Sequence, residues 1–221
     1  MMTILEAIRS RHSVRSYTAQ TIPPDLASRL QTEIDACNQE SGLSIQLVTD
    51  EPEAFDGMMA HYGKFSGVRN YIALIGRGSD RLEEQVGYYG ERLALLAQTL
   101  GLNTCWVAMS FSKGVVKKRC VVAGGEKLVC VLALGYGATQ GVPHRSKAMA
   151  QLCRTDGVMP DWFKAGMEAA LLAPTAVNQQ KFLITLEDGR VTAKSLGGFY
   201  SKVDLGIVRY HFDVGSGKTA G

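Results

Sequence analysis

The stretch Arg11-His12-Ser13-Val14-Arg15-Ser16-Tyr17 follows a predicted short helix, whose start is marked by the capping-box spacing of Thr3 and Glu6. Arginine offers a planar fork of donors to two phosphate oxygens, and serine adds a hydroxyl donor. In an extended segment, residues 11, 13 and 15 would point to the same side. The sequence therefore predicts a phosphate site here, and the alternative interpretation is a solvated basic loop.

A second polar stretch, Ala173-Pro174-Thr175-Ala176-Val177-Asn178-Gln179-Gln180, follows a helix predicted to begin at Asp161 and to end before Pro174. Threonine hydroxyl and asparagine amide groups suit the carbonyls and ring nitrogens of a flat heterocycle. We interpret this stretch as a second part of a ligand site. The alternative is a turn that only ends the helix.

The third stretch is Gly101-Leu102-Asn103-Thr104-Cys105-Trp106-Val107, in which a glycine ends a long helix and a strand follows. Backbone N–H groups after this strand could reach a ligand ring, and Trp106 could form a pocket wall. The alternative is that the whole segment belongs to the hydrophobic core.

Together the three stretches resemble the FMN-dependent nitroreductase family, over residues 4 to about 212. In typical members the Pro-Ser/Thr-x-x-Asn motif soon follows the Arg-x-Ser-x-Arg motif, and two chains share each flavin. Here the two motifs lie about 160 residues apart along the chain. The chain is thus similar to a single-chain subgroup in which two fused halves replace the dimer, and we expect one FMN per chain.

The resemblance implies a set of FMN-binding residues. In the first half these are the basic and hydroxyl residues, a lysine near the pyrimidine edge, and the stretch whose backbone approaches flavin N5, namely Arg11, His12, Ser13, Arg15, Lys64, Trp106, Ala108 and Met109. The second half adds late basic residues and the partner-lobe motif, namely Arg145, Lys147, Pro174, Thr175 and Asn178. For Lys64 the alternative is a surface lysine, and for Arg145 and Lys147 a solvated linker. No protein acid or base is visible, so we predict no catalytic side chain.

The pattern of elements predicts an α+β fold of the nitroreductase type, with two related lobes forming a pseudo-dimer. A Pro-Asp pair, a helix and a strand ending near residue 49 are matched by Pro160-Asp161, a helix and a strand ending at Leu186. A long helix with an acid then follows in each half, Glu91 in one and Asp204 in the other. We predict a first lobe over 1–140 with the phosphate loop, and a shorter second lobe over 141–221.

Composition narrows the class of protein further. The 221 residues include 46% hydrophobic and 20% charged residues, which is typical of a globular chain, and the net charge of +3 does not predict nucleic-acid binding. The five cysteines and four histidines have no disulfide or metal-ligand spacing. With no signal peptide or membrane span apparent, we expect a cytoplasmic protein and a reducing compartment. We expect a monomer, and the alternative is a dimer.

The function implied by the resemblance is transfer of reducing equivalents from NADH or NADPH, through FMN, to a small nitroaromatic or quinone-like acceptor. The flavin would carry the hydride chemistry, and the protein would position the ring. Two alternatives keep the flavin: another reaction on the same scaffold, such as ene reduction, dehalogenation or flavin breakdown, and a non-catalytic flavin-binding or sensor protein. A third is an interaction domain without a cofactor.

Overall fold

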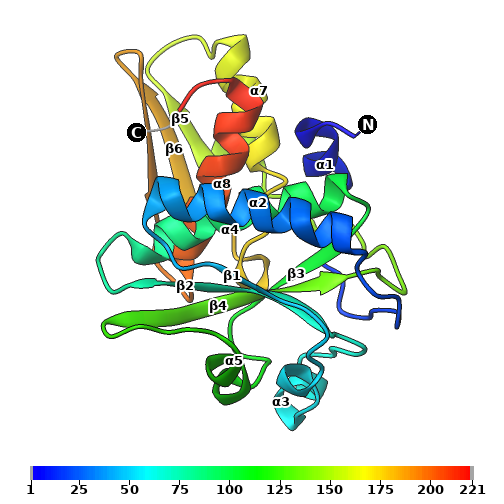
Figure 1. Cartoon of the computed structure of the whole chain (residues 1–221). Coiled ribbons are helices and arrows are strands. Elements are labelled where there is room, and N and C mark those ends of the chain that lie inside the picture. Colours follow the sequence, from blue (N-terminus) through cyan, green and yellow to red (C-terminus); the bar gives the residue numbers. More distant parts are fainter. Residues whose placement is uncertain (1, 220–221) are drawn as a thin grey trace. The chain divides into compact units, whose positions relative to one another are not determined.

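The computed structural model describes residues 2–219 and shows a mixed helix and sheet protein (Figure 1). Its helices are α1 (Ile4–Ser10), α2 (Pro24–Ser41), η1 (Glu53–Phe55), α3 (Met58–Tyr62), α4 (Leu82–Thr99), α5 (Lys113–Arg119), α6 (Met149–Leu152), α7 (Asp161–Ala170), η2 (Ala176–Asn178) and α8 (Ser201–Ser216). Its strands are β1 (Gln46–Val48), β2 (Asn70–Arg77), β3 (Asn103–Val107), β4 (Glu126–Gly135), β5 (Cys153–Thr155), β6 (Phe182–Glu187) and β7 (Arg190–Ser195). The predicted α+β class is confirmed.

The chain divides into two compact units. The four-stranded unit contains Arg11–Leu82 and Leu93–Pro143, and the three-stranded unit contains Met1–Ser10, Glu83–Arg92 and His144–Gly221. This division shares a boundary near residue 143 with the predicted lobes over 1–140 and 141–221. It differs from them in α1 and the first half of α4, which belong with the C-terminal residues. The pseudo-dimer itself stays a prediction.

The four-stranded unit is built on an antiparallel sheet in the order β1-β2-β4-β3. The central pair places Tyr71 opposite Ala133, and β3 pairs with β4 so that Asn103 lies opposite Gly135. Helix α2 and the end of α4 cover one face of the sheet, while α3 and α5 cover the other (Figure 1). Strand β2 is buried from Asn70 to Gly76, as expected for a strand covered on both faces.

An aromatic cluster fills the space between this sheet and the segments around η1. Phe55 lies at its centre, with ring centroids 5.4 Å from Phe65, 6.2 Å from Tyr71 and 6.2 Å from Phe111. All four side chains are buried. Aromatic pairs at these separations stabilise the fold beyond the effect of burying their apolar surface. The cluster therefore holds the segments on either side of η1 in place.

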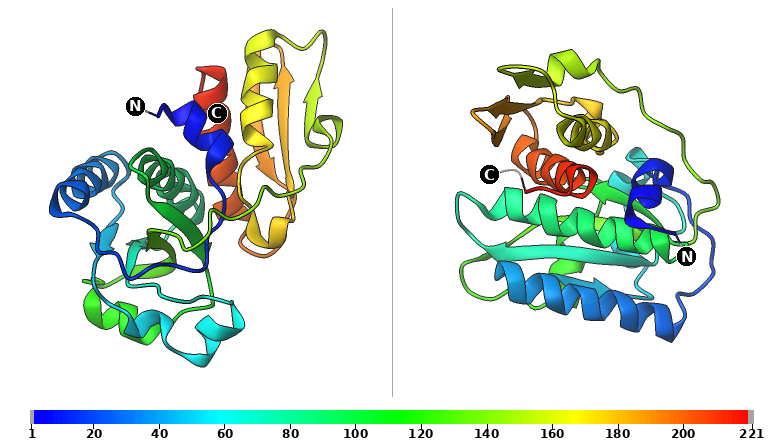
Figure 2. Two further views of the ribbon diagram at one scale, coloured as in Figure 1. Left: turned by 90° about the vertical axis from the view of Figure 1, so that its right-hand side faces the viewer. Right: turned by 90° about the horizontal axis from the view of Figure 1, so that it is seen from above.

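The three-stranded unit contains the sheet β5-β6-β7, in which β5 is parallel and β7 antiparallel to β6. Helices α7 and α8 pack together beside this sheet (Figure 2). The pair Asp188-Gly189 predicts a two-residue hairpin turn. Their φ values of 50° and 71° are those that a type I′ turn requires, and β6 and β7 pair on either side, so the hairpin is confirmed. In this unit His211 is fully buried, with its Nε2 2.9 Å from Glu91 Oε1 and its Nδ1 3.0 Å from the carbonyl oxygen of Ala169.

The helices begin and end close to the residues that the sequence indicates, whereas the start of β1 does not. Thr3 Oγ1 accepts from the Glu6 N–H at 3.2 Å while Glu6 Oε2 accepts from the Thr3 N–H at 2.7 Å, which confirms the capping box. The alternation of Leu43, Ile45 and Leu47 predicts a strand over those residues. Strand β1 starts only at Gln46, because both backbone groups of Ile45 bond to the Asn38 amide, at 2.9 and 2.8 Å.

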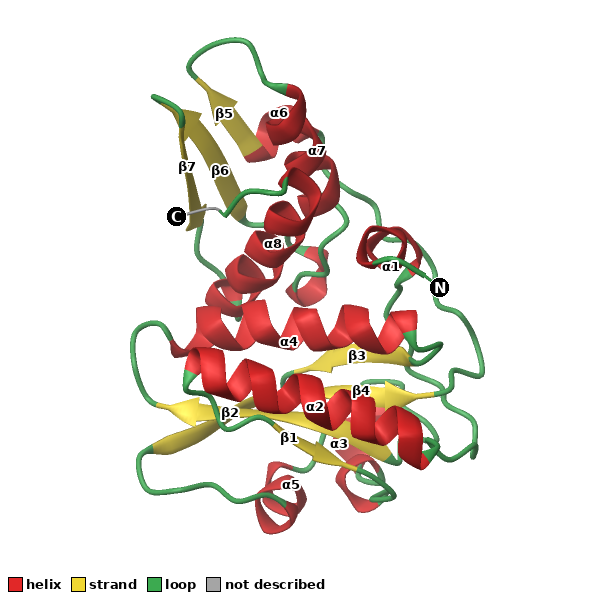
Figure 3. Cartoon of the chain, turned by 45° about the horizontal axis from the view of Figure 1, so that its top comes forward, coloured by secondary structure: helices red, strands yellow, loops and turns green. Residues whose placement is uncertain are grey.

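Helices α4 and α8 approach closely through two glycines (Figure 3). A Cβ built on Gly87 would lie 2.0 Å from the carbonyl oxygen of Val203. A Cβ built on Gly206 would lie 2.0 Å from the carbonyl oxygen of Glu84. No real side chain tolerates such distances, so this helix contact depends on the absence of a Cβ at both positions.

Gly87→Ala should therefore lower the free energy of unfolding by ~2 kcal/mol or more, because the new methyl group overlaps a backbone carbonyl. Gly114→Ala is the matched control, since Gly114 is also helical but has open space around its Cβ position. That change should leave stability unchanged or raise it by up to ~1 kcal/mol. Urea unfolding measures both, and equal stabilities for the two variants would contradict the close helix contact.

Candidate functional site

The Arg11–Tyr17 segment, called here the cationic loop, is anchored to the sheet of the four-stranded unit at two points. Ser13 forms a parallel bridge with Thr104 on β3, and the Val14 N–H donates to the Thr104 carbonyl at 3.1 Å. Tyr17 donates through its hydroxyl to the Ala133 carbonyl on β4 at 3.3 Å. Val14 and Tyr17 are buried, so they fix the loop while Ser13 and Arg15 keep access to the surface.

Burial in the cationic loop does not alternate. The buried residues are Arg11, Val14 and Tyr17, three apart, because the segment forms single bridges instead of a continuous strand. Arg11 is only 5% exposed, so the alternative of a solvated basic loop fails for this residue. A buried cation is costly unless its charge is compensated, so its burial points to a structural or ligand-binding role. Arg15 is exposed, and its guanidinium carbon lies 5.8 Å from the centre of the Phe65 ring.

The segment that carries Lys64 lies along the cationic loop. The Ser66 N–H donates to the Arg15 carbonyl at 2.9 Å, and the Ser66 hydroxyl donates to Ser16 Oγ at 3.0 Å. Lys64 itself is exposed and has a left-handed φ of 60°. These contacts place the backbone of the Lys64 segment beside Arg15 within the same unit.

The segment after β3 joins the same region. A Cβ built on Gly63 would lie 2.5 Å from the Cβ of Ser110, so the Gly63 backbone packs against the Ser110 side chain, just after Met109. Trp106 is half-buried on β3, Ala108 is partly exposed, and Met109 is 54% exposed. An exposed methionine after a buried strand is available to contact a ligand, which a purely structural core segment would not be.

The loop after β4 packs against the cationic loop, although sequence reasoning assigned it no role in the site. The Asn103 side chain, which is buried, accepts from the Gly137 N–H at 2.9 Å and donates to Gln140 Oε1 at 3.2 Å. A Cβ on Gly141 would lie 2.8 Å from the Cβ of His12, so this loop packs directly against half-buried His12. The polar Asn103 at the start of a buried strand was the available signal.

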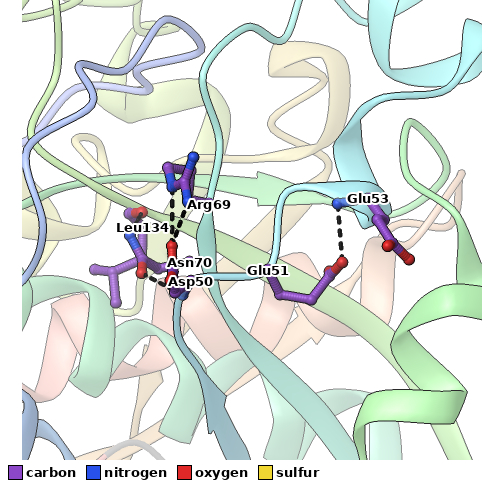
Figure 4. Close-up of polar contacts among 6 residues, drawn as sticks. All are labelled: Asp50, Glu51, Glu53, Arg69, Asn70 and Leu134. Atoms are coloured by element: carbon purple, nitrogen blue, oxygen red, sulfur yellow. Dashed lines mark hydrogen bonds and ion pairs between the residues drawn. The ribbon is translucent and has the colours of Figure 1, made fainter.

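A polar network connects the start of β2 with the end of β4 (Figure 4). The Asn70 amide oxygen accepts from the Asp50 N–H at 3.1 Å, and its nitrogen donates to the Leu134 carbonyl at 3.4 Å. Arg69 pairs with the Asp50 carboxylate, and Glu51 accepts from the Glu53 N–H at 2.8 Å. The network fixes the end of β4. Two residues after this strand, Gly137 forms an antiparallel bridge with Tyr17.

The second motif lies in the three-stranded unit. Its residues Thr175–Gln180 form a tight turn, called here the amide turn, in which Thr175 Oγ1 accepts from the Gln180 N–H at 3.1 Å. Val177, Asn178 and Gln180 have left-handed φ of 46°, 54° and 46°. Such values are strained for residues other than glycine, most of all for β-branched valine. Strain of this kind concentrates at functional sites, which supports the prediction that the amide turn is part of a ligand site.

The predicted basic residues Arg145 and Lys147 lie against the amide turn. Lys147 Nζ donates to the carbonyls of Gln179 at 2.7 Å and Gln180 at 3.0 Å. The Arg145 carbonyl accepts from Asn178 Nδ2 at 3.0 Å. The alternative of a solvated linker therefore does not describe the backbone of this segment, although both side chains are exposed.

The opposite side of the amide turn is bound by Asp204 on α8, to which sequence reasoning gave no site role. Its carboxylate accepts from the Ala176 N–H at 2.9 Å and from Gln179 Nε2 at 2.7 Å. Burial raises the pKa of Asp204 to about 6, while the two hydrogen bonds act in the opposite direction. The carboxylate is thus mostly ionised at neutral pH.

The predicted site residues therefore divide between the two units, and their joint role in one site stays a prediction. The four-stranded unit contains the first group: Arg11, His12, Ser13, Arg15, Lys64, Trp106, Ala108 and Met109. The three-stranded unit assembles the second: Arg145, Lys147, Pro174, Thr175 and Asn178. The first group supplies guanidinium, hydroxyl and ammonium donors, a set suited to a phosphate.

Other features carry little chemistry. Within residues 2–219 no cluster of histidine, cysteine and acidic side chains could hold a metal ion. All five cysteines are buried and reduced. No described helix combines the length and apolar character needed to cross a membrane.

Comparison with solved structures identifies the fold. A structure described as a "putative nitroreductase" from Thermotoga maritima covers 96% of this chain and 82% of its own, with 21% identity and a TM-score of 0.64. A nitroreductase-like protein from Streptococcus mutans covers 66% and 94%, with 14% identity and a TM-score of 0.56. A "putative nitroreductase" from Desulfovibrio desulfuricans, solved in complex with FMN, covers 69% and 96%, with 14% identity and a TM-score of 0.53.

Sequence comparison gives the family. No curated protein matches the chain. A family model does, over residues 3–216, which is nearly the whole chain. The nitroreductase-like fold predicted from three short motifs is confirmed by the structural matches. The chain belongs to the nitroreductase family described as "Putative TM nitroreductase".

Proposed function

We propose that this protein is an FMN-dependent oxidoreductase that passes reducing equivalents from NADH or NADPH to nitroaromatic or quinone-like acceptors. Family membership supports an oxidoreductase, and the FMN bound to the Desulfovibrio protein of the same fold supports the choice of flavin. The observation that carries the proposal is the buried Arg11 in a loop that Ser13 and Val14 hold on β3.

The donor groups present fit the phosphate of FMN in charge and in kind. Arg11 and Arg15 provide two guanidinium groups, and the half-buried Ser13 between them provides a hydroxyl. Two cations balance a phosphate dianion, and guanidinium donors match its oxygens in pairs. These three side chains would hold the phosphate, with His12 beside them.

The remaining predicted residues would surround the ring. We expect Lys64 at its pyrimidine edge and the backbone at Trp106, Ala108 and Met109 near N5, as the family resemblance implies. The prediction that Pro174, Thr175 and Asn178, with Arg145 and Lys147, bind the same flavin stays a prediction. Asn178 Nδ2 uses one hydrogen for the Arg145 carbonyl and retains a second for a ligand.

Bound FMN would supply the hydride chemistry, and the residues of the chain would tune it. Reduction increases negative charge near the pyrimidine edge, so a fixed cation there favours the reduced state. Lys64 and Arg15 are the candidates for this role, and their segments are joined by the Ser66 to Arg15 hydrogen bond. The mechanism assigns no acid or base to the protein, and the acceptor would be a small molecule.

A spectroscopic experiment tests the proposed function. The purified protein, supplied with FMN, should show the flavin absorbance bands, lose them anaerobically with NADH or NADPH, and regain them with nitrofurazone or menadione. Bound FMN without bleaching would favour the non-catalytic flavin-binding alternative. Failure to bind FMN would overturn the proposal. A cytoplasmic location and a monomeric chain stay predictions, checked by fractionation and by light scattering.

A further inference from the structure

We propose that Asp204 is a positioning residue that holds the amide turn in the conformation in which it binds the flavin. The proposal deepens the proposed function and rests on it. It concerns a contact made wholly within the three-stranded unit, between α8 and residues Thr175–Gln180.

The amide turn needs an external support because its backbone is strained. Val177, Asn178 and Gln180 all occupy the left-handed region, which costs free energy for each of them. Gln180 is buried, but Val177 is 88% exposed and Asn178 is also exposed, so side-chain burial does not compensate that cost at Val177 and Asn178. The hydrogen bonds made by the turn must therefore maintain its shape.

Asp204 accepts two of those hydrogen bonds, one on each carboxylate oxygen. Oδ1 accepts from the Ala176 N–H at 2.9 Å, at the start of the turn, and Oδ2 accepts from the Gln179 side chain at 2.7 Å. The same Gln179 nitrogen donates to the Phe199 carbonyl at 2.7 Å. A carboxylate therefore connects both sides of Asn178 to α8.

The chemistry of the contact requires an ionised acid. Asp204 is 4% exposed, and hydrogen bonds to a buried carboxylate are shorter and stronger than those between neutral groups. In Asp204→Asn, Oδ1 could still accept from Ala176, but the new NH2 group would face the Gln179 NH2 group. A flip of Gln179 would relieve that clash only by removing the donor from the Phe199 carbonyl.

Three variants test the proposal: Asp204→Ala, Asp204→Asn and the control Asp213→Asn. Asp213 also lies on α8, nine residues after Asp204, and accepts from the Tyr88 hydroxyl at 3.0 Å, a bond that asparagine can keep. Two readouts are needed. One is amide hydrogen exchange at Ala176, Asn178, Gln179 and Gln180 without flavin, and the other is the dissociation constant for FMN.

For Asp204→Ala we expect exchange at Ala176 to rise about tenfold or more and FMN affinity to fall by about tenfold, as loss of hydrogen bonds to a charged group requires. Asp204→Asn should lie between this variant and the parent in both readouts, because one bond survives. Asp213→Asn should match the parent in both. If Asp204→Ala does not fold, as judged by circular dichroism, Asp204→Asn carries the test.

The possible failures are distinguishable. If the parent binds FMN and both Asp204 variants bind it equally well, the positioning role is wrong while the proposed function stands. If exchange in the turn stays at the parent rate, Asp204 does not hold the turn. If exchange rises throughout the unit, including α7, the residue stabilises the whole unit and the positioning role is rejected. If the parent itself does not bind FMN, the proposed function fails.

Discussion

Arg11→Ala should weaken FMN binding by about tenfold to a hundredfold. Loss of a charged hydrogen bond to phosphate costs about 1.5–3 kcal/mol, and each 1.4 kcal/mol is a factor of ten in affinity. Arg11 is 5% exposed and lies two residues before Ser13, which forms a bridge with Thr104, so its side chain is held in place by the fold. Quenching of FMN fluorescence on titration measures the dissociation constant.

Two further variants separate charge from geometry in this prediction. Arg9→Ala removes an exposed cation from α1 and should leave the affinity unchanged. Arg11→Lys keeps the charge but loses the paired donors, so it should bind FMN with intermediate affinity. Unfolding curves show whether each variant remains folded. Parent-like affinity in folded Arg11→Ala would contradict the phosphate assignment.

Gly67→Ala should destabilise the protein and impair the site together. Gly67 has a φ of +69°, and a Cβ there would lie 2.3 Å from the carbonyl oxygen of Tyr17, the last residue of the cationic loop. The left-handed backbone alone costs about 1–2 kcal/mol for alanine, and the overlap with a carbonyl adds about 1–3 kcal/mol. We expect a loss of ~3 kcal/mol in the free energy of unfolding, and FMN affinity reduced about tenfold as the loop shifts.

Gly42→Ala provides the matched control for this variant. Gly42 has nearly the same φ, +72°, at the end of α2, but nothing lies within 4 Å of its Cβ position. Gly42→Ala should cost only the conformational part of the free energy of unfolding, about 1–2 kcal/mol, and leave FMN affinity unchanged. Urea unfolding and flavin titration measure both effects. Equal stability losses in the two variants would show that the Tyr17 contact is not tight.

Much of the fold was predictable because its signals are local. The Pro23-Pro24 start and Gly42 end of α2, the Gly101 signal after α4 and the Asp188-Gly189 turn each depend on residues a few positions apart. Strand β1 was predicted less well, since its start depends on Asn38, seven residues from Ile45. The membership of α1 and the first half of α4 in the C-terminal unit depends on contacts more than 100 residues apart, such as Glu91 with His211.

The candidate site divides in the same way. Residue types and short spacings made the cationic loop and the amide turn candidate segments, because phosphate and heterocycle binding need particular donors close together. The family resemblance then gave their residues roles in FMN binding, and these roles stay predictions. Asn103 and Asp204 were missed as site residues, since their roles come from partners 34 and 28 positions away. A polar residue among apolar neighbours indicates burial with a hydrogen-bond partner, but the sequence does not say which partner.

The central claim is that one FMN binds to each chain through the cationic loop. It is tested most directly by titrating the flavin-free parent protein with FMN and counting bound flavin per chain, with riboflavin as the ligand that lacks the phosphate. We predict one FMN per chain, and at least tenfold weaker binding of riboflavin because Arg11, Ser13 and Arg15 lose their ligand. Absence of FMN binding, or equal affinity for FMN and riboflavin, would contradict the account.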